Sequence, residues 1–481
     1  MISMLAVLSW PFVVFWLFAN RSPAVAVTAA IVGGYLLLPR NYAIELPAVP
    51  SLNKDSIPAL AALLAAAMLG RKLQRQAPVT VLPGLFPRSR VVRILFVLML
   101  VGSAATVLTN GDVARYGGKV LPALRPYDLA SALGNTLFTL LPFLLARKFL
   151  AHPDTQKILL IGLAVAGLLY SLPAIYEVRM SPQLSRNIYG YFPHSWVQHI
   201  RAGGFRPVVF LSHGLWLAIF FCSAFLAAMS LWRSSSGKIR TRWLAASAWL
   251  FLTLVLSKGI GALGIGLLLG AMILFLPIRL QVIGAAVIAA ALMIYPMLRG
   301  ADMIPTESLL NLAHNVDPDR EASLRFRLMN EDILLEKAKE RPLFGWGGWG
   351  RNRVFDEEGR DISVTDGYWV MAIGTGGWVG YVVQFGLLLI PMMFLGLRWK
   401  QLVLTPATAG LTLALTANMI DLIPNATLTP MTWLLAGALA GRLEMGRVAD
   451  TAGQILQQGL GRQSAYTRQP RRHPPHMVAS R

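Results

Sequence analysis

Apolar runs of about 20 residues recur along most of this 481-residue chain. Such a run crosses the hydrocarbon core of a bilayer when it forms a helix. Only 14% of the residues are charged, whereas soluble proteins carry about 25%. We therefore expect an all-α fold, a polytopic transmembrane helical bundle that forms a single membrane domain.

About 12 or 13 of the runs are predicted to span the membrane. They cover residues 3–19, 23–39, 56–70, 91–109, 127–147, 158–177, 207–232, 243–257, 260–277, 281–298, 369–396, 405–424 and 427–442. The transmembrane domain is expected over residues 1–447. Residues 448–481 are rich in Gln, Arg, Pro and Ser, which predicts a disordered basic cytoplasmic tail. The first run lacks a basic leader and a clean cleavage site, so we expect it to be retained.

Basic residues gather in particular loops. The chain has 44 Lys and Arg against 23 Asp and Glu, a net charge of +21. The loops at 71–93 and 233–242 contain six and four basic residues and no acid. The positive-inside rule places both loops and the tail in the cytoplasm and the N-terminus outside. Membrane topology thus explains the charge, and we expect no nucleic-acid partner.

The other side of the membrane receives the loops at 40–55, 110–126 and 178–206 and one large periplasmic loop, about 299–366. Besides Asp366, this last loop holds thirteen of the 23 acidic residues. A long loop in a compact protein usually has a function. Apolar residues at helical spacing predict an amphipathic helix on the membrane face, ended by a glycine-rich aromatic turn. The residues concerned are Phe326, Met329 and Ile333, then Pro342 and the turn at 345–350.

Ionisable residues near the outer ends of the spans are the candidates for function, because charge within a membrane is costly. The first group is Arg201-Ala-Gly-Gly-Phe-Arg206-Pro207, with His213 two turns into the following span. Arginine binds phosphate through two parallel hydrogen bonds, and glycines allow close backbone approach. The alternatives are that the arginines only reach the membrane interface and that His213 only packs between helices.

The second group is the turn Ser257-Lys258-Gly259, which places a lysine on the side opposite the basic loops. That position suggests an anionic ligand or a lipid headgroup. The third is Thr365-Asp366-Gly367 at the end of the large loop. Asp366 could accept a proton as a general base, could cap the next helix, or both.

The fourth group combines Arg327 on the predicted loop helix with Asp421 near the outer end of the 405–424 span. The alternative is that these charges are simply solvated. We find no Cys/His metal cluster, nucleotide-binding glycine loop or Ser-His-Asp pattern, and the single cysteine, Cys222, lies in an apolar run. We therefore expect no metal and no cofactor, so any donor substrate must arrive already activated.

Across about residues 60–440 the chain resembles the O-antigen ligase and polysaccharide polymerase superfamily. These bacterial inner-membrane enzymes transfer glycans from undecaprenyl pyrophosphate at the outer face of the membrane. The resemblance rests on four motifs in a shared order around one large outer loop. They are Arg201-x-Gly-Gly-Phe-x-Pro207, the turn at 257–259, Glu340-Arg-Pro-Leu-Phe-Gly-Trp-Gly347, and the polar pair 366–367 followed by Gly377-x-x-Gly380.

The resemblance implies a role for each motif. Arg201 would hold the lipid pyrophosphate with Arg206 beside it, and Lys258 stands where the ligases have a second arginine. Asp366 stands where the ligases have the histidine that deprotonates the acceptor hydroxyl. This difference favours polymerisation of exopolysaccharide or O-antigen repeat units over ligation to lipid A-core. The implied partners are the lipid-linked glycan donor, a glycan acceptor, the lipid bilayer, and polysaccharide export or chain-length machinery.

Two other classes of function fit these residues less well. A transporter or flippase would place charges and broken helices near the membrane midplane, whereas these charges lie at the outer rim. A structural membrane protein would not explain outward-facing Arg and Lys around one loop. If the chain is a glycosyltransferase, Arg201, Lys258 and Asp366 should line one cavity that opens outward.

Overall fold

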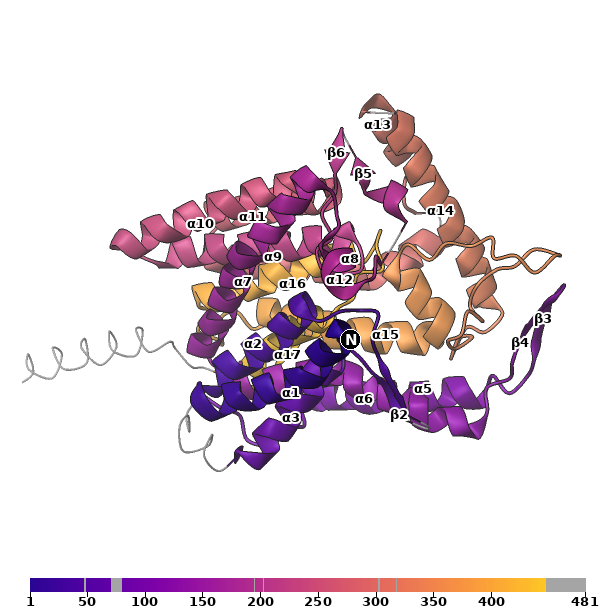
Figure 1. Cartoon of the computed structure of the whole chain (residues 1–481), viewed down its shortest axis with the longest axis horizontal. Helices are drawn as coiled ribbons and strands as arrows, with labels where there is room; N and C mark the ends of the chain where they lie inside the picture. The colour runs from indigo at the N-terminus through magenta and orange to yellow at the C-terminus, as the bar shows by residue number, and fades with distance from the viewer. Residues whose placement is uncertain are drawn as a thin grey trace, which may run out of the picture.

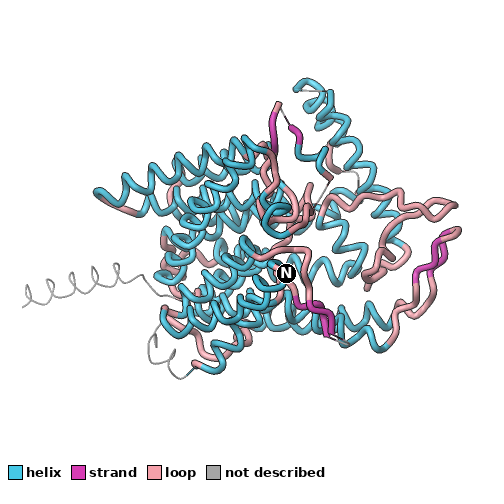
Figure 2. Tube along the Cα trace, in the orientation of Figure 1, coloured by secondary structure: helices cyan, strands magenta, loops and turns pink. Residues whose placement is uncertain are grey.

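The computed structural model describes residues 1–46, 49–70, 80–193, 195–201, 203–301, 303–316 and 318–446. The predicted tail at 448–481 and part of the basic loop at 71–93 lie outside these residues. Helices make up most of the described chain, and its strands form three short antiparallel hairpins (Figure 2). The expected all-α fold is therefore confirmed.

Each of the thirteen predicted spans contains a helix (Figure 1). These helices are α1 (Ile2–Asn20), α2 (Pro23–Leu37), α3 (Ile57–Met68), α5 (Arg90–Leu108), α6 (Pro126–Phe149), α7 (Pro153–Met180), α9 (Gly214–Ser234), α10 (Gly237–Leu256), α11 (Ile260–Phe275), α12 (Ile278–Gly300), α15 (Tyr368–Leu397), α16 (Pro406–Asp421) and α17 (Pro430–Met445). Within the described residues, eight are long and apolar enough to cross a membrane: α1, α5, α6, α7, α9, α10, α12 and α15. The other five are shorter.

The eight long helices make this chain a multi-pass α-helical membrane protein. Their burial orders them from the centre of the bundle to its edge. In the most apolar 18-residue stretch of α9, 83% of the residues are buried. The corresponding share is 22% in α1 and in α10. Helices α7, α10, α11 and α16 pack around α9, so α9 is the central element of one half of the bundle.

Small residues bring some helices into backbone contact. Gly437 and Gly441, four residues apart on α17, face α6. A Cβ atom on Gly437 would lie 2.1 Å from the carbonyl oxygen of Phe143, and one on Gly441 would lie 2.5 Å from that of Arg147. Small residues at this spacing are typical of packed transmembrane helices, because close approach increases van der Waals contact.

The short elements gather at one end of the long helices, which we call the loop end (Figure 1). They are β1 (Ile44–Leu46), β2 (Val49–Leu52), β3 (Ala114–Tyr116), β4 (Lys119–Leu121), α8 (Leu184–Tyr189), the 3₁₀ helix η1 (Trp196–His199), β5 (Ile200–Arg201), β6 (Gly204–Phe205), α13 (Thr306–Val316) and α14 (Pro318–Lys339). The connection between α9 and α10 lies at the opposite end. The loops predicted to share one side thus lie together, while the assignment of that side to the periplasm stays a prediction.

The segment 206–213 departs from the predicted span at 207–232, because α9 begins only at Gly214. Buried polar side chains hold this non-helical segment. The Glu177 carboxylate accepts the backbone N–H groups of Val208 at 2.8 Å and Val209 at 2.7 Å, and Lys54 donates to the carbonyl of Phe210 at 3.0 Å. Irregular backbone at membrane depth needs such partners, and a hydropathy pattern does not reveal them.

The predicted loop helix is α14, with α13 before it. Its buried side chains differ from the apolar set that predicted it. Phe326 and Met329 are 47% and 52% exposed, whereas Asn330 and Leu334 are buried. Asn330 accepts the backbone N–H of Val364 at 2.7 Å, which attaches the helix to the end of the large loop.

Candidate functional site

Two predicted phosphate-binding motifs meet at the loop end. The β5–β6 hairpin carries the Arg201 to Phe205 motif, and the turn at 257–259 joins α10 to α11. Nη2 of Arg206 donates to the carbonyl oxygen of Lys258 at 3.1 Å. The backbone of Arg201 pairs with Gly204, and its side chain lies outside what the structure describes. The fold thus joins motifs about fifty residues apart.

Lys258 has an unusual backbone. Its φ of +55° lies in the left-handed region, which residues other than glycine seldom occupy. This conformation directs the side chain toward the hairpin, where a Cβ atom on Gly204 would lie 2.7 Å from Lys258 Nζ. Glycine at position 204 therefore leaves the space that the ammonium group occupies. Backbone strain of this kind is often found at functional sites.

His213 does not lie two turns into a span. It is the N-cap residue of α9, and its Nδ1 atom accepts the backbone N–H of Leu215 at 3.1 Å. The prediction placed it inside the helix because it began the span at Pro207. Its ring centroid lies 5.1 Å from that of His199. Arg40 adds a further cation at this end of α9, with its guanidinium 4.8 Å from the Trp216 ring.

Asp366 and Arg327 form a second group. The Arg327 Nε atom lies 3.6 Å from the Asp366 Oδ2 atom, and both side chains are about one-third exposed. The N-cap residue of α15 is Gly367, and among the described residues no side-chain hydrogen bond caps that helix end. The reading of Asp366 as a helix cap is therefore wrong, because its carboxylate faces the loop helix.

Asp421 belongs to the same group through Asn425. The Asp421 carboxylate is buried and accepts hydrogen bonds from Asn425 Nδ2 at 2.8 Å and Thr427 Oγ1 at 2.7 Å. Arg327 Nη1 in turn donates to the Pro424 carbonyl at 3.1 Å and lies 3.4 Å from Asn425 Oδ1. Neither Arg327 nor Asp421 is thus merely solvated, and Asp421 orders the loop that Arg327 contacts.

Glu331 is a candidate that the sequence did not single out. It lies one helical turn after Arg327, is only 6% exposed, and its Oε2 atom is 3.9 Å from Arg299 Nε. Burial raises the pKa of the Glu331 carboxyl to about 7, against the opposing charge of Arg299. The four-residue spacing of Arg327 and Glu331 was the available signal, but many solvated helices share it.

The motif at residues 340–347 contacts the motif that contains Gly377, at a break in α15. Gly377 has non-helical angles, φ 65° and ψ −170°, inside this helix. The turn at 342–347 fills the break. Trp378 and Val379 donate their backbone N–H groups to Pro342 and Leu343, at 2.8 and 3.2 Å. Trp346 and Gly347 donate to the carbonyls of Gly374 and Thr375, both at 2.9 Å, so backbone groups freed by the break are satisfied.

The cavities described at the loop end lie apart from three of the candidate residues. Two adjacent cavities of about 510 and 270 Å³ lie at the loop end, and Arg206, Lys258 and Asp366 line neither of them. The expectation that Arg201, Lys258 and Asp366 line one outward cavity stays a prediction, because the Arg201 side chain lies outside the described residues. The nearest connection is Tyr368, two residues after Asp366, which lines both cavities.

The fold and the grouped charges define a polytopic α-helical membrane protein with polar groups concentrated at one end. No family model matches this chain, and no curated protein matches it. Its function must therefore be inferred from its own residues.

Proposed function

We propose that this protein is a membrane-embedded glycosyltransferase that polymerises exopolysaccharide or O-antigen repeat units. The donor would be a glycan on undecaprenyl pyrophosphate, and the acceptor a sugar hydroxyl at the loop end. Transfer would take place at the periplasmic face of the bacterial inner membrane. Polysaccharide export or chain-length machinery would be the partner.

The observation that supports this proposal best is the contact between Arg206 and Lys258. Their motifs are far apart in sequence, yet the guanidinium is hydrogen-bonded to the lysine backbone beside a glycine hairpin. Two adjacent cations beside glycines suit a pyrophosphate, because negative charge on its oxygens increases as its bond to the sugar breaks. The carboxylate of Asp366 supplies a proton acceptor at the same end of the bundle.

The chemistry follows from these two groups. The acceptor hydroxyl oxygen would attack the anomeric carbon of the donor sugar while Asp366 takes the hydroxyl proton. The bond between that carbon and the pyrophosphate oxygen would break with its electron pair remaining on the oxygen. Arg206 and Lys258 would stabilise the released pyrophosphate, and the anomeric configuration would invert. Asp366 and these cations must approach each other through substrate or through movement of α14.

A transporter is the second candidate, because α15 is a discontinuous helix, as many transporter helices are. In transporters the freed backbone groups face the substrate. Here the turn at 342–347 occupies the break with backbone hydrogen bonds, which favours a structural role for it. Ligation to lipid A-core is the other alternative within the enzyme class.

Purified full-length protein should elongate lipid-linked oligosaccharides extracted from the bacterium that carries the gene. Lys258→Ala should lower the rate about tenfold to a hundredfold, because a charge-assisted hydrogen bond to phosphate contributes about 1.5–3 kcal/mol. Arg186→Ala, which removes an exposed cation from α8 at the same end, should have no effect. Equal rates for wild type and Lys258→Ala, or flipping of donor without elongation, would contradict the proposal.

The side of the membrane can be tested separately. Ser308→Cys in α13 should react with an impermeant maleimide added to intact cells, whereas Ser236→Cys between α9 and α10 should not. Labelling of Ser236→Cys from outside would place the loop end in the cytoplasm and remove the lipid-linked donor from reach.

A further inference from the structure

The larger of the two cavities is lined by both apolar and polar residues, and nine of its ten polar residues are uncharged. It measures about 510 Å³, within the range of roughly 300–1,000 Å³ typical of small-molecule sites. Helices α5, α6 and α15 and the turn at 347–349 surround it. Its polar lining residues are Ser103, Thr106, Asp128, Ser131, Asn135, Thr136, Thr139, Tyr368, Thr375 and Gln384.

Much of this polar lining comes from one face of α6. Asp128, Ser131, Asn135 and Thr139 follow at intervals of three or four residues, which places them on one side of the helix. Within the described residues, the side chains of Ser131, Asn135 and Thr139 make no hydrogen bond to other protein groups. Asp128 accepts the Arg125 backbone N–H at 2.7 Å. A membrane helix thus presents a row of hydrogen-bonding groups toward the cavity.

The smaller cavity extends the larger one. It measures about 270 Å³ and shares Asn135, Thr139 and Tyr368 with its neighbour. The β2–α3 connection and the start of α17 form its other walls, through residues such as Asn53 and Thr429. Because both cavities lie along α6 and share lining residues, we treat them as one groove, which we call the α6 groove. Two adjoining cavities can hold successive units of a chain molecule.

Trp349 lies at the rim of the α6 groove and is 78% exposed. Its φ of +62° is in the left-handed region, where a bulky residue is a rare exception. Burial cannot explain this conformation, because most of the indole faces outward. Trp349 is thus an exposed aromatic ring beside the groove, and its backbone conformation is strained. This combination points to a ligand that stacks on the ring.

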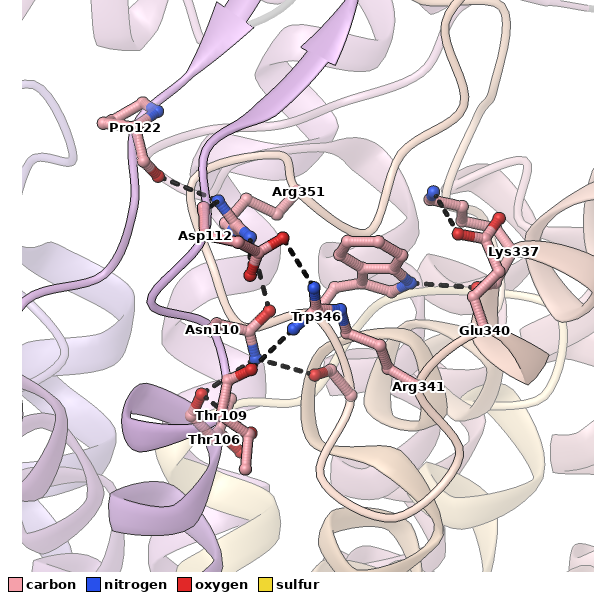
Figure 3. A network of polar contacts seen from close by, with 11 residues as sticks. Thr106, Thr109, Asn110, Asp112, Pro122, Lys337, Glu340, Arg341, Trp346 and Arg351 are labelled. Carbon is pink, nitrogen blue, oxygen red and sulfur yellow. Dashed lines mark hydrogen bonds and ion pairs between the residues drawn. The ribbon is translucent and has the colours of Figure 1, made fainter.

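Hydrogen bonds on both sides of Trp349 hold the turn that carries it, and Figure 3 draws the residues that make them. Before it, Asn110 Nδ2 donates to the Gly345 carbonyl at 2.9 Å. After it, the buried Arg351 donates to the carbonyls of Asp112 at 3.0 Å and Pro122 at 2.9 Å. The Asp112 carboxylate also pairs with Arg341 at 2.7 Å. Contacts on both sides therefore support the strained residue and preset its position.

We propose that the α6 groove binds an uncharged oligosaccharide, with a sugar ring stacked on Trp349. Hydroxyl and amide side chains match sugar hydroxyls as donors and acceptors. Among the described residues the lining includes no Lys or Arg, which disfavours a pyrophosphate, and the row of hydrogen-bonding side chains on α6 disfavours an acyl chain. The role of this oligosaccharide as the acceptor in glycan transfer rests on the proposed function. Its binding to the groove is independent of the proposed function.

Binding can be measured without catalysis. Saturation-transfer difference NMR on the full-length protein in detergent would use neutral gluco-, galacto- and manno-oligosaccharides as probes. At least one of these oligosaccharides should bind. Trp349→Ala should weaken its binding about tenfold and Thr139→Val about threefold to tenfold. Leu343→Ala is the matched control, because Leu343 is exposed on the neighbouring turn but does not line the groove.

The outcomes separate this proposal from the proposed function. Binding that depends on Trp349, in a protein that never elongates a lipid-linked glycan, would support the groove and contradict the transferase. Elongation with unchanged binding in Trp349→Ala would do the reverse. No binding of any neutral oligosaccharide, or displacement of bound phospholipid as the only event at the groove, would overturn the groove proposal.

Discussion

The Nε atom of Arg327 lies 3.6 Å from the Oδ2 atom of Asp366, which joins the loop helix α14 to the segment before α15. Because both side chains are about one-third exposed, a sugar hydroxyl from solvent can reach the carboxylate. The same arginine contacts Pro424 and Asn425 in the α16–α17 loop. Arg327 therefore joins three parts of the loop end, namely α14, the segment before α15 and the α16–α17 loop.

Asp366→Asn tests the general base. Since Asp366 does not cap α15, the amide should leave the fold intact while it removes proton acceptance. We expect the elongation rate to fall by about a hundredfold or more, measured with equal amounts of folded protein. Glu358→Gln, at an exposed acid of the same loop, should retain full activity. An Asn variant as fast as wild type would leave Asp366 with only a positioning role.

Lys258→Gly separates charge from backbone strain. Glycine tolerates the left-handed φ, so the variant should gain about 1–2 kcal/mol of stability while it loses activity. Ser181→Gly, at another left-handed residue of the loop end, should gain stability and keep activity. Thermal unfolding in detergent and the elongation assay give the two readouts. Loss of stability in Lys258→Gly would show that the ammonium mainly supports the fold.

Glu331 predicts a pH-dependent stability. Burial raises its pKa from 4.5 to about 7, so the folded protein binds this proton more tightly than the unfolded chain does. The stabilisation of the folded state by this proton is fully present below pH 4.5 and is lost as pH rises through 7. The full difference is about 3 kcal/mol, because one pKa unit corresponds to about 1.4 kcal/mol. Unfolding temperatures should fall between pH 5 and 8 in wild type and much less in Glu331→Gln. Glu340→Gln should follow wild type, and identical curves for wild type and Glu331→Gln would contradict the assignment.

Gly377→Ala should damage the break in α15. Its φ is +65°, and a Cβ atom would lie 2.3 Å from the carbonyl of Leu343, so the turn at 342–347 must move. We expect a loss of about 2–3 kcal/mol in the free energy of unfolding. The adjacent Gly376 has open space at its Cβ position, which makes Gly376→Ala a close control. Equal stability of the two variants would show that the turn is not tightly docked.

A buried ion pair at the opposite end should matter for stability alone. Arg147 and Glu444 are buried and bonded to each other, and the Glu444 carboxylate also accepts the Arg88 backbone N–H at 2.9 Å. Glu444→Ala would leave a buried guanidinium unpaired, at a cost of about 3–5 kcal/mol. Glu336→Ala, which breaks an exposed pair with Lys339, should change stability little. Comparable effects in the two variants would show that the Arg147 pair is solvated.

Much of the candidate site was predictable as motifs, though not as geometry. The sequence marked Arg206, Lys258, Arg327 and Asp366 because charges beside apolar runs are rare and costly. It did not reveal that Arg206 bonds to Lys258, or that Arg327 pairs with Asp366. It also passed over Glu331, because an acid on a loop helix is ordinarily solvated.

The sequence by itself determined the class of protein and the position of every described long helix, because hydropathy and run length are local properties of the chain. It also marked the glycines at 345 and 377, although not their purpose. Only the tertiary structure decided where helices stop inside apolar runs. Gly214 begins α9 because the buried Glu177 and Lys54 bind the segment before it, and α15 breaks at Gly377 because a distant turn supplies the missing hydrogen bonds. Such partners lie far away along the chain, so only folding brings them within reach.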